Sequence, residues 1–115
     1  MSHRSHSNLA AKRRTHALVF AALGDATRLS LVAVLCGGQP RSISQLTEGS
    51  RLTRQAITKH LRVLESAGVV RSVRTGRESL FRLDSERIEE AKGYLDRVSE
   101  HWDQALHRLE SFLED

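Results

Sequence analysis

Residues 51–77 read RLTRQAITKHLRVLESAGVVRSVRTGR, and this stretch decides the fold. Ile57, Leu61 and Leu64 recur at the three- and four-residue spacing of a helix, so we expect one helical face to be buried. Gly68 is expected to end this helix, and a short strand and an arginine-rich turn should follow. The opposite face of the helix carries polar and basic side chains, namely Arg54, Gln55, Thr58, Lys59 and Arg62.

The charge of this stretch favours a polyanionic partner. It holds seven basic residues and a single acid, Glu65. The basic residues are Arg51, Arg54, Lys59, Arg62, Arg71, Arg74 and Arg77. A helix that is apolar on one side and carries Arg, Lys, Gln and Thr on the other suits the major groove of DNA, where such side chains reach guanine and adenine edges. The segment therefore predicts a DNA-binding regulator.

The residues on either side complete a helix-turn-helix. A short helix is expected over residues 44–48, capped by Ser42 or Ser44, and residues 49–52 form a tight turn. Thr53 then caps the basic helix over residues 54–67. A short helix, a turn containing glycine and a longer basic helix make up the helix-turn-helix, whose second helix enters the major groove.

A β-hairpin is predicted after the basic helix. Residues 69–73 and 79–83 read as paired strands, and the turn over residues 74–78 has Gly76 where a positive φ is needed. This hairpin would form a wing beside the helix-turn-helix. No other segment alternates like a strand, so the sheet should be small.

Two helices are expected ahead of this unit. The apolar run over residues 17–23 predicts the first helix, which Gly24 ends. Asp25 is a suitable N-cap for a second helix over residues 26–36. Its buried face is expected to include Leu29, Val32, Ala33 and either Leu35 or Cys36.

The last part of the chain predicts a long helix from Glu86 to about Leu113, roughly 40 Å long. Its apolar residues are spaced alternately by three and four positions, a heptad pattern typical of helices that pair. They are Leu95, Val98, Trp102, Ala105, Leu109 and Phe112, with Leu106 and Leu113 widening the stripe. So small a domain cannot cover this stripe, so we expect a second copy to do so; the alternative is a helix folded back on its own domain.

Composition bounds the function class. The 115 residues suit one domain with a flexible tail over residues 1–12, a DNA-binding unit over residues 13–84 and a dimerisation helix over residues 85–115. Residues 1–83 carry 14 basic and 4 acidic residues, whereas residues 84–115 carry 4 and 10, so the two parts should have different roles. One cysteine and no membrane-length apolar run lead us to expect a cytoplasmic protein.

Three pieces of the chain together resemble the ArsR family of winged helix-turn-helix transcriptional repressors. They are FAALGDATRLSLVAVL over residues 20–35, LTRQAITKHLRVLESAGVV over residues 52–70 and RTGRESLFRL over residues 74–83. In the first piece, Ala26 stands where the family usually has proline. The ending HWDQALHRLESFLED over residues 101–115 is similar to one branch of the family, whose last helix carries an aromatic residue and a leucine-rich stripe.

The resemblance implies a mainly α-helical fold with a small β-hairpin, in the order α-α-α-α-β-β-α. It also implies a homodimer paired through the first and last helices, which binds an inverted-repeat operator and is released by a signal. The residues expected to contact DNA are Thr53, Arg54, Gln55, Thr58, Lys59, Arg62, Arg74, Gly76 and Arg77. Those expected at the dimer interface are Leu18, Leu95, Val98, Trp102, Ala105, Leu106, Leu109 and Phe112.

No metal or other cofactor is expected. The thiolate sites of the family need a Cys-x-Cys pair at the third helix, where this chain has Ser42 to Leu46, and Cys36 is interpreted as a core residue. His107 and Glu110 keep the H-x-x-E spacing of zinc-sensing relatives, but the Asp-x-His of those relatives is missing, which leaves too few donors for zinc. His3 and His6, at the polar start of the chain, are interpreted as non-ligands.

Three functions other than a simple DNA-binding repressor are considered. An enzyme is disfavoured because the chain has no glycine-rich phosphate loop and no paired Cys/His or Ser/His/Asp set. A metal- or redox-responsive repressor of the same family, and a winged-helix module that assembles proteins, remain alternatives. A small organic molecule, oxidation of Cys36 or a protein partner could each serve as the inducing signal.

Overall fold

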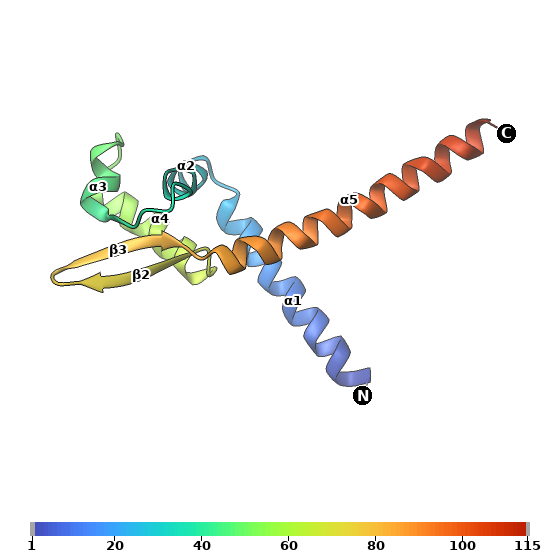
Figure 1. Cartoon of the computed structure of the whole chain (residues 1–115), viewed down its shortest axis with the longest axis horizontal. Helices are drawn as coiled ribbons and strands as arrows, with labels where there is room; N and C mark the ends of the chain where they lie inside the picture. The colour runs from blue at the N-terminus through green and yellow to red at the C-terminus, as the bar shows by residue number, and fades with distance from the viewer. Residues whose placement is uncertain (1, 115) are drawn as a thin grey trace.

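The computed structural model of the chain describes the backbone of residues 2–114 and the side chains of residues 8–114. A small winged domain forms one end of the molecule, and its first and last helices leave it as two long arms (Figure 1). The elements follow in the order α1 (Ser2–Leu23), α2 (Ala26–Leu35), β1 (Arg41–Ser42), α3 (Ile43–Glu48), α4 (Arg54–Ser66), β2 (Val70–Thr75), β3 (Glu78–Leu83) and α5 (Ser85–Glu114).

This order confirms the predicted winged helix-turn-helix. Helices α3 and α4 form the helix-turn-helix, and β2 and β3 form the wing, with Thr75 opposite Glu78 at its tip. The structure adds β1, whose Arg41 lies opposite Phe81 of β3, so the antiparallel sheet has the order β1-β3-β2. Two residues are too few to show the alternation that marks a strand, which is why the sequence did not reveal β1.

The predicted helix caps are present. The side chain of Asp25 accepts a hydrogen bond from the Arg28 backbone at 3.0 Å and so caps α2. Ser42 caps α3 in a reciprocal capping box with Gln45. Thr53 accepts from the Ala56 backbone at 3.1 Å and caps α4. These caps fix where each helix of the winged domain begins.

Gly68 sets the angle between α4 and the wing. Its φ of +78° is favourable only for glycine, and a Cβ there would come within 2.9 Å of the Arg87 side chain. The chain therefore turns sharply out of α4 into β2 and leaves room for the start of α5.

The core lies where α4 crosses α1, α2 and the sheet. Its members include Val19, Leu31, Leu35, Leu46, Ile57, Leu61, Leu64, Val69, Val70 and Phe81. Because residues from nearly every element of the winged domain meet there, the core fixes α4 relative to the wing.

The sequence-based account of α2 needs correction. Leu31 and Leu35 are buried, whereas Leu29 is 52% exposed. Ala33 and Cys36 are exposed as well, so the interpretation of Cys36 as a core residue is wrong. The apolar residues of this helix surround its axis, so spacing alone could not show which side faces the core.

The first helix also begins earlier than expected. Helix α1 starts at Ser2, so residues 8–12, expected within a tail, have helical backbone. The basic residues ahead of the apolar run are good helix formers, which is consistent with this extension. The flexibility of residues 1–12 stays a prediction.

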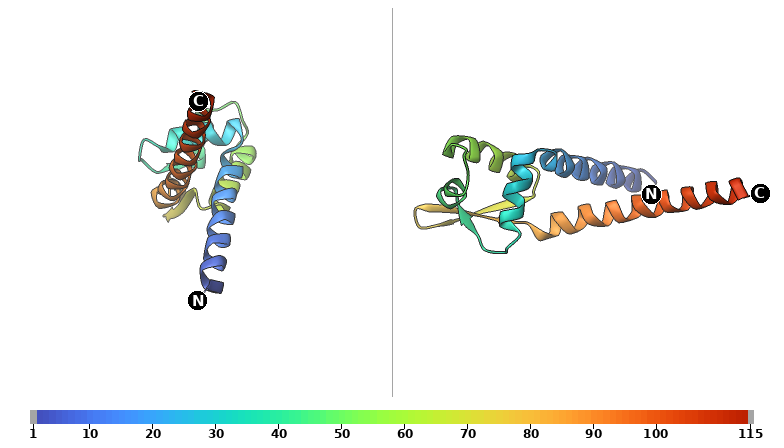
Figure 2. Two further views of the ribbon diagram at one scale, coloured as in Figure 1. Left: turned by 90° about the vertical axis from the view of Figure 1, so that its right-hand side faces the viewer. Right: turned by 90° about the horizontal axis from the view of Figure 1, so that it is seen from above.

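Helix α5 packs on its own domain only over its first part. Ala91 is buried, and the Tyr94 ring stacks on His16 of α1 with 4.9 Å between ring centroids. Beyond that contact α5 runs free of the body, as Figure 2 shows from two further sides. In the described part of the chain no single helix could cross a membrane by length and composition; only α1 from Asn8 and α2 taken together could, and they are bent by 98°.

Replacing Leu61 by Ala should destabilise the fold by about 2–5 kcal/mol, because Leu61 is fully buried and its truncation leaves a cavity. The control is Val63→Ala on the same helix, where the side chain is 43% exposed and the loss should be well under half as large. Urea unfolding followed by circular dichroism measures both. Equal losses would mean that α4 is oriented wrongly in the structure.

Candidate nucleic-acid interface

Helix α4 separates its apolar and basic residues onto two faces. Ile57, Leu61 and Leu64 are at most 1% exposed. The side chains at the other face are exposed, namely Arg54, Gln55, Lys59 and Arg62, and Thr53 is exposed at the start of the helix. The predicted contact residues of this helix therefore share one accessible surface.

Two hydrogen bonds order the start of this surface. The guanidinium of Arg54 donates through Nη1 to the Ser44 hydroxyl of α3 at 2.9 Å. The hydroxyl of Thr58, which is partly buried, donates to the Arg54 carbonyl at 2.8 Å. Arg54 is thus oriented by the preceding helix, whereas Thr58 can offer a ligand only its methyl group and the remaining acceptor capacity of its oxygen.

The wing lies beside this surface. Arg74, Gly76 and Arg77 are exposed at its tip, and Gly76 has a φ of +64° with open space around it. Arg77 of the wing and Arg54 of α4 line the same shallow cleft of about 160 Å³, together with Ser42 and Ser44. The structure therefore brings the α4 and wing candidates to one side of the molecule.

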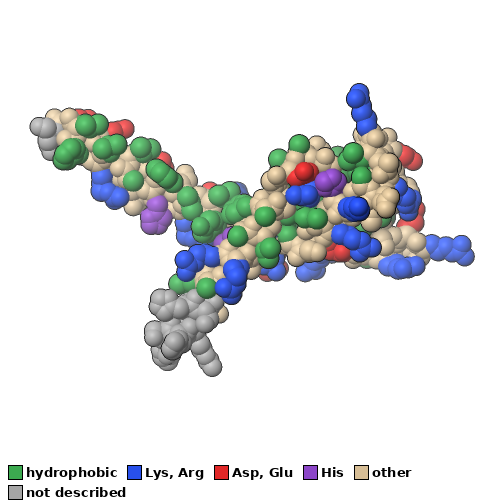
Figure 3. Space-filling view, turned by 180° about the vertical axis from the view of Figure 1, so that it is seen from behind, with side chains coloured by type: hydrophobic (Ala, Val, Ile, Leu, Met, Phe, Trp, Pro, Cys, Tyr) green, Lys and Arg blue, Asp and Glu red, His purple; other side chains and the backbone are tan. Residues whose placement is uncertain are grey.

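Basic side chains gather at the end of the molecule that holds the helix-turn-helix and the wing, away from the tip of α5 (Figure 3). Not all of the charge counted from the sequence is available there. Arg71 donates through Nε to the Asp84 carboxylate at 3.0 Å, which partly neutralises it. The carboxylate of Glu65 accepts the Ser72 hydroxyl at 2.6 Å, so this acid is tied to the base of the wing.

A polar cluster links α4 to the start of α2. His60, partly buried on α4, has its Nδ1 3.4 Å from Nη1 of Arg28 and 3.9 Å from the Asp25 carboxylate. The hydrogen bond from the Arg28 backbone lowers the pKa of Asp25, and the positive charge of Arg28 lowers it further. These contacts join His60 of α4 to the start of α2 and help to position α4.

The residues expected at a dimer interface are mostly uncovered. Trp102 is 65% exposed and Phe112 77%, and Leu18, Leu95, Leu106 and Leu109 are each more than half exposed. Val98 and Ala105 are partly buried. Leu18 lies on α1 and the others lie on α5, along which hydrophobic side chains form a green band in Figure 3.

Within the described residues no group of three or more His, Cys, Asp or Glu side chains could hold a metal ion. His107 lies with Asp103, Gln104 and Arg108 on an exposed part of α5. His3 and His6 lie outside the residues whose side chains the structure describes. The side chains around His107 supply too few nitrogen, sulfur or carboxylate donors for a four-coordinate zinc site.

Sequence reasoning missed two residues that shape this surface. Ser44 was considered only as a helix cap, yet it holds Arg54. Asp84 was not assigned to this surface, yet it pairs with Arg71. No sequence signal identifies either partner, because each contact joins different elements of the fold.

Comparisons with known proteins agree with this geometry. A family model described as a helix-turn-helix domain matches residues 23–73. The chain is 35% identical over 85 residues to the HTH-type transcriptional regulator YuzN of Bacillus subtilis, a match that spans 68% of this chain and 92% of YuzN. It is 32% identical over 85 residues to the HTH-type transcriptional repressor SmtB of Mycobacterium tuberculosis, spanning 74% of this chain and 61% of SmtB.

A solved structure of a transcriptional regulator is also similar to this chain. The ArsR-like transcriptional regulator from Rhodococcus sp. RHA1 has a TM-score of 0.78 and 34% identity, covering 89% of this chain and 95% of that one. Sequence and fold thus agree over the helix-turn-helix, the wing and much of the terminal helices. The chain belongs to the ArsR-like family of helix-turn-helix transcriptional regulators.

Proposed function

We propose that the chain is a sequence-specific DNA-binding repressor that binds an inverted-repeat operator as a homodimer. In this proposal α4 lies in the major groove, and the wing residues 74–78 contact the adjacent backbone or minor groove. The observation that carries the proposal is the split of α4: its apolar face is buried in the core while its basic face is exposed beside the wing.

The chemistry of the exposed face suits direct base contact. Arg and Lys side chains bind the O6 and N7 atoms of guanine, and Gln binds adenine. Arg54, Gln55 and Lys59 lie in the first turns of α4, the end of a recognition helix that meets base edges. Arg62, about a turn further along, is proposed to contact phosphate, as are Arg74 and Arg77 of the wing.

The uncovered stripe of α5 supports the homodimer. A contiguous apolar surface of this kind rarely stays in water, and its heptad spacing matches that of a second helix of the same kind. A twofold axis through the long helices would present two copies of α4, and successive major grooves require them about 34–36 Å apart. An operator with two inverted half-sites follows from that symmetry.

We propose repression for two reasons: the protein is proposed to bind an operator, and one relative is named a repressor. A dimer seated on an operator within a promoter blocks transcription, and the similar SmtB protein is named a repressor. We further propose that the protein acts in the cytoplasm and is not an enzyme, in keeping with relatives that are transcriptional regulators.

Replacing both Arg54 and Lys59 by Ala should abolish specific DNA binding and leave the helical content unchanged. Each base contact of this kind contributes about 1–3 kcal/mol of discrimination, so the double variant should lose at least a hundredfold in affinity. Gel-shift titrations with DNA selected from a random pool provide the measurement, and circular dichroism checks the fold.

The matched control is Lys92→Ala with Arg97→Ala, which removes the same charge from exposed positions of α5. It should bind DNA nearly as the native chain does. The native affinity should also fall with salt, with a slope of about −0.9 per phosphate neutralised. Absence of any retardation at low salt would favour the protein-assembly module instead.

Trp102→Glu should convert the dimer to a monomer, because it places a charge in the middle of the apolar stripe. Light scattering measures the mass, and operator affinity should fall at least tenfold since one half-site contributes alone. Gln104→Glu, exposed on α5 outside the stripe, is the control and should stay dimeric. An intact dimer in Trp102→Glu would refute the proposed interface.

Zinc and chelators should leave DNA affinity unchanged, because the described residues offer no cluster of metal donors. The measurement is a gel shift with added zinc chloride and, separately, with EDTA. A shift in affinity of tenfold or more in either direction would restore the metal-responsive alternative.

A further inference from the structure

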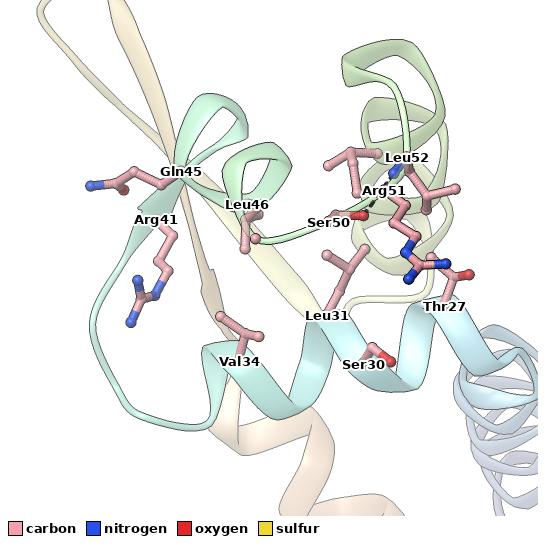
Figure 4. Close-up of a pocket in the computed structure, with 12 residues that line it drawn as sticks. Thr27, Ser30, Leu31, Val34, Arg41, Gln45, Leu46, Ser50, Arg51 and Leu52 are labelled. Atoms are coloured by element: carbon pink, nitrogen blue, oxygen red, sulfur yellow. Dashed lines mark hydrogen bonds between the residues drawn. The ribbon is translucent and has the colours of Figure 1, made fainter.

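A cleft lies on the side of the winged domain formed by α2 and the turn that joins α3 to α4 (Figure 4). Its volume is about 480 Å³, within the range of roughly 300–1,000 Å³ found for small-molecule sites. Neither the DNA-contact residues proposed above nor the apolar stripe of α5 lines it. The cleft is therefore a separate feature of the domain.

The floor of the cleft is apolar. Leu31 of α2, Leu46 of α3 and Ile57 of α4 are buried side chains whose surfaces line it. Val34 and Leu52 complete the apolar part, and Val34 is 46% exposed although it belongs to the same surface. An apolar group of matching size would cover this surface and gain free energy from its removal from water.

The rim of the cleft is positively charged. Arg41 and Arg51 line it, and none of the lining residues is acidic. Within the described part of the chain, neither guanidinium makes an ion pair or a side-chain hydrogen bond, and the Nε of Arg41 is buried without an acceptor. Because the guanidinium of Arg41 has no acceptor within this part of the chain, its accessible N–H groups can donate to a ligand that supplies one.

A hydroxyl group adds a further donor. The oxygen of Ser50 accepts a hydrogen bond from the Leu52 backbone at 3.0 Å, which leaves its own proton available. In Figure 4 this hydroxyl and the Leu52 side chain belong to the α3–α4 turn that faces α2 across the cleft. Cationic and neutral donors thus surround an apolar floor.

We propose that this cleft binds an organic anion with an apolar body and a carboxylate group. The carboxylate would accept hydrogen bonds from Arg41, and the apolar body would lie on Leu31, Val34 and Leu46 and extend toward Ser50 and Arg51 at the other end of the cleft (Figure 4). Inorganic phosphate lacks the apolar part, and a neutral alcohol cannot neutralise the arginines. A medium-length alkyl carboxylate fits both requirements.

Binding there would bear on DNA recognition, an effect that rests on the DNA-binding function proposed above. The cleft joins α2 to the turn immediately before α4, and Ile57 of α4 forms part of its floor. A ligand would therefore stabilise one spacing of α2 and α4, and its negative charge would reduce the net positive charge of the winged domain. We infer that the bound anion weakens DNA binding, and by linkage that DNA weakens anion binding equally.

The test is isothermal titration calorimetry of the full chain, without DNA, using sodium octanoate, octan-1-ol and sodium phosphate as probes. Octanoate should bind at one site per chain, and the other two should bind at least tenfold more weakly. Octanol affinity equal to that of octanoate would overturn the proposal, because the charged rim would then contribute nothing to binding. Phosphate affinity equal to that of octanoate would also overturn it, because the apolar floor would then contribute nothing.

Variants locate the site. Arg41→Gln should weaken octanoate binding about tenfold or more, since a hydrogen bond to a charged group contributes on this scale. Arg82→Gln, an exposed arginine on the neighbouring strand, makes the same change of charge and should have no effect. Val34→Trp should also block binding by filling the cleft, and circular dichroism checks that each variant is folded. Unchanged octanoate binding in both Arg41→Gln and Val34→Trp would overturn the proposal.

Gel shifts with saturating octanoate test the coupling. Octanoate should lower the DNA affinity of the native chain at least fivefold. It should not change the DNA affinity of Val34→Trp, in which the cleft is filled. Because the calorimetry does not involve DNA, it tests the anion site independently. The anion site could therefore be demonstrated even if the protein did not bind DNA. If instead Arg41→Gln weakens DNA binding while octanoate binding is unaffected, the arginines serve the nucleic acid and the anion site is refuted.

Discussion

The packing of Ile57, Leu61 and Leu64 against α1, α2 and the sheet is the interaction on which the rest of the structure depends. This packing buries one face of α4 completely. The basic residues on the opposite face are therefore exposed to solvent. The wing follows α4 directly through Gly68, so its position is set by the same contacts. A helix held in this way can enter a major groove without rearrangement, and little ordering entropy is lost on binding DNA.

Local signals were enough to predict much of this arrangement. The caps at Asp25 and Thr53 and the turn at Gly76 are properties of a few neighbouring residues, so the sequence shows them directly. The strong separation of apolar and basic residues along α4 likewise identified both its buried face and its exposed face. The helix-turn-helix, the wing and the exposed members of the candidate DNA surface could therefore be predicted without coordinates.

Features that join distant parts of the chain could not be predicted. Strand β1 exists only because Arg41 and Ser42 pair with β3. The exposure of Cys36 depends on how α2 rotates against α4, and the pairing of Arg71 with Asp84 depends on where α5 begins. The cleft between α2 and the α3–α4 turn is of the same kind, since its lining comes from several elements and has no signature in the sequence.

The proposed function needs two copies of the chain, and the uncovered stripe of α5 is where a second chain would set the distance between the two α4 helices. The most direct measurement of that claim is hydroxyl-radical footprinting on DNA selected from a random pool by the native chain. The account predicts two inverted half-sites protected on one face of the duplex, with centres about 10–10.5 base pairs apart or a multiple of that. A single protected half-site, or direct repeats with variable spacing, would contradict it.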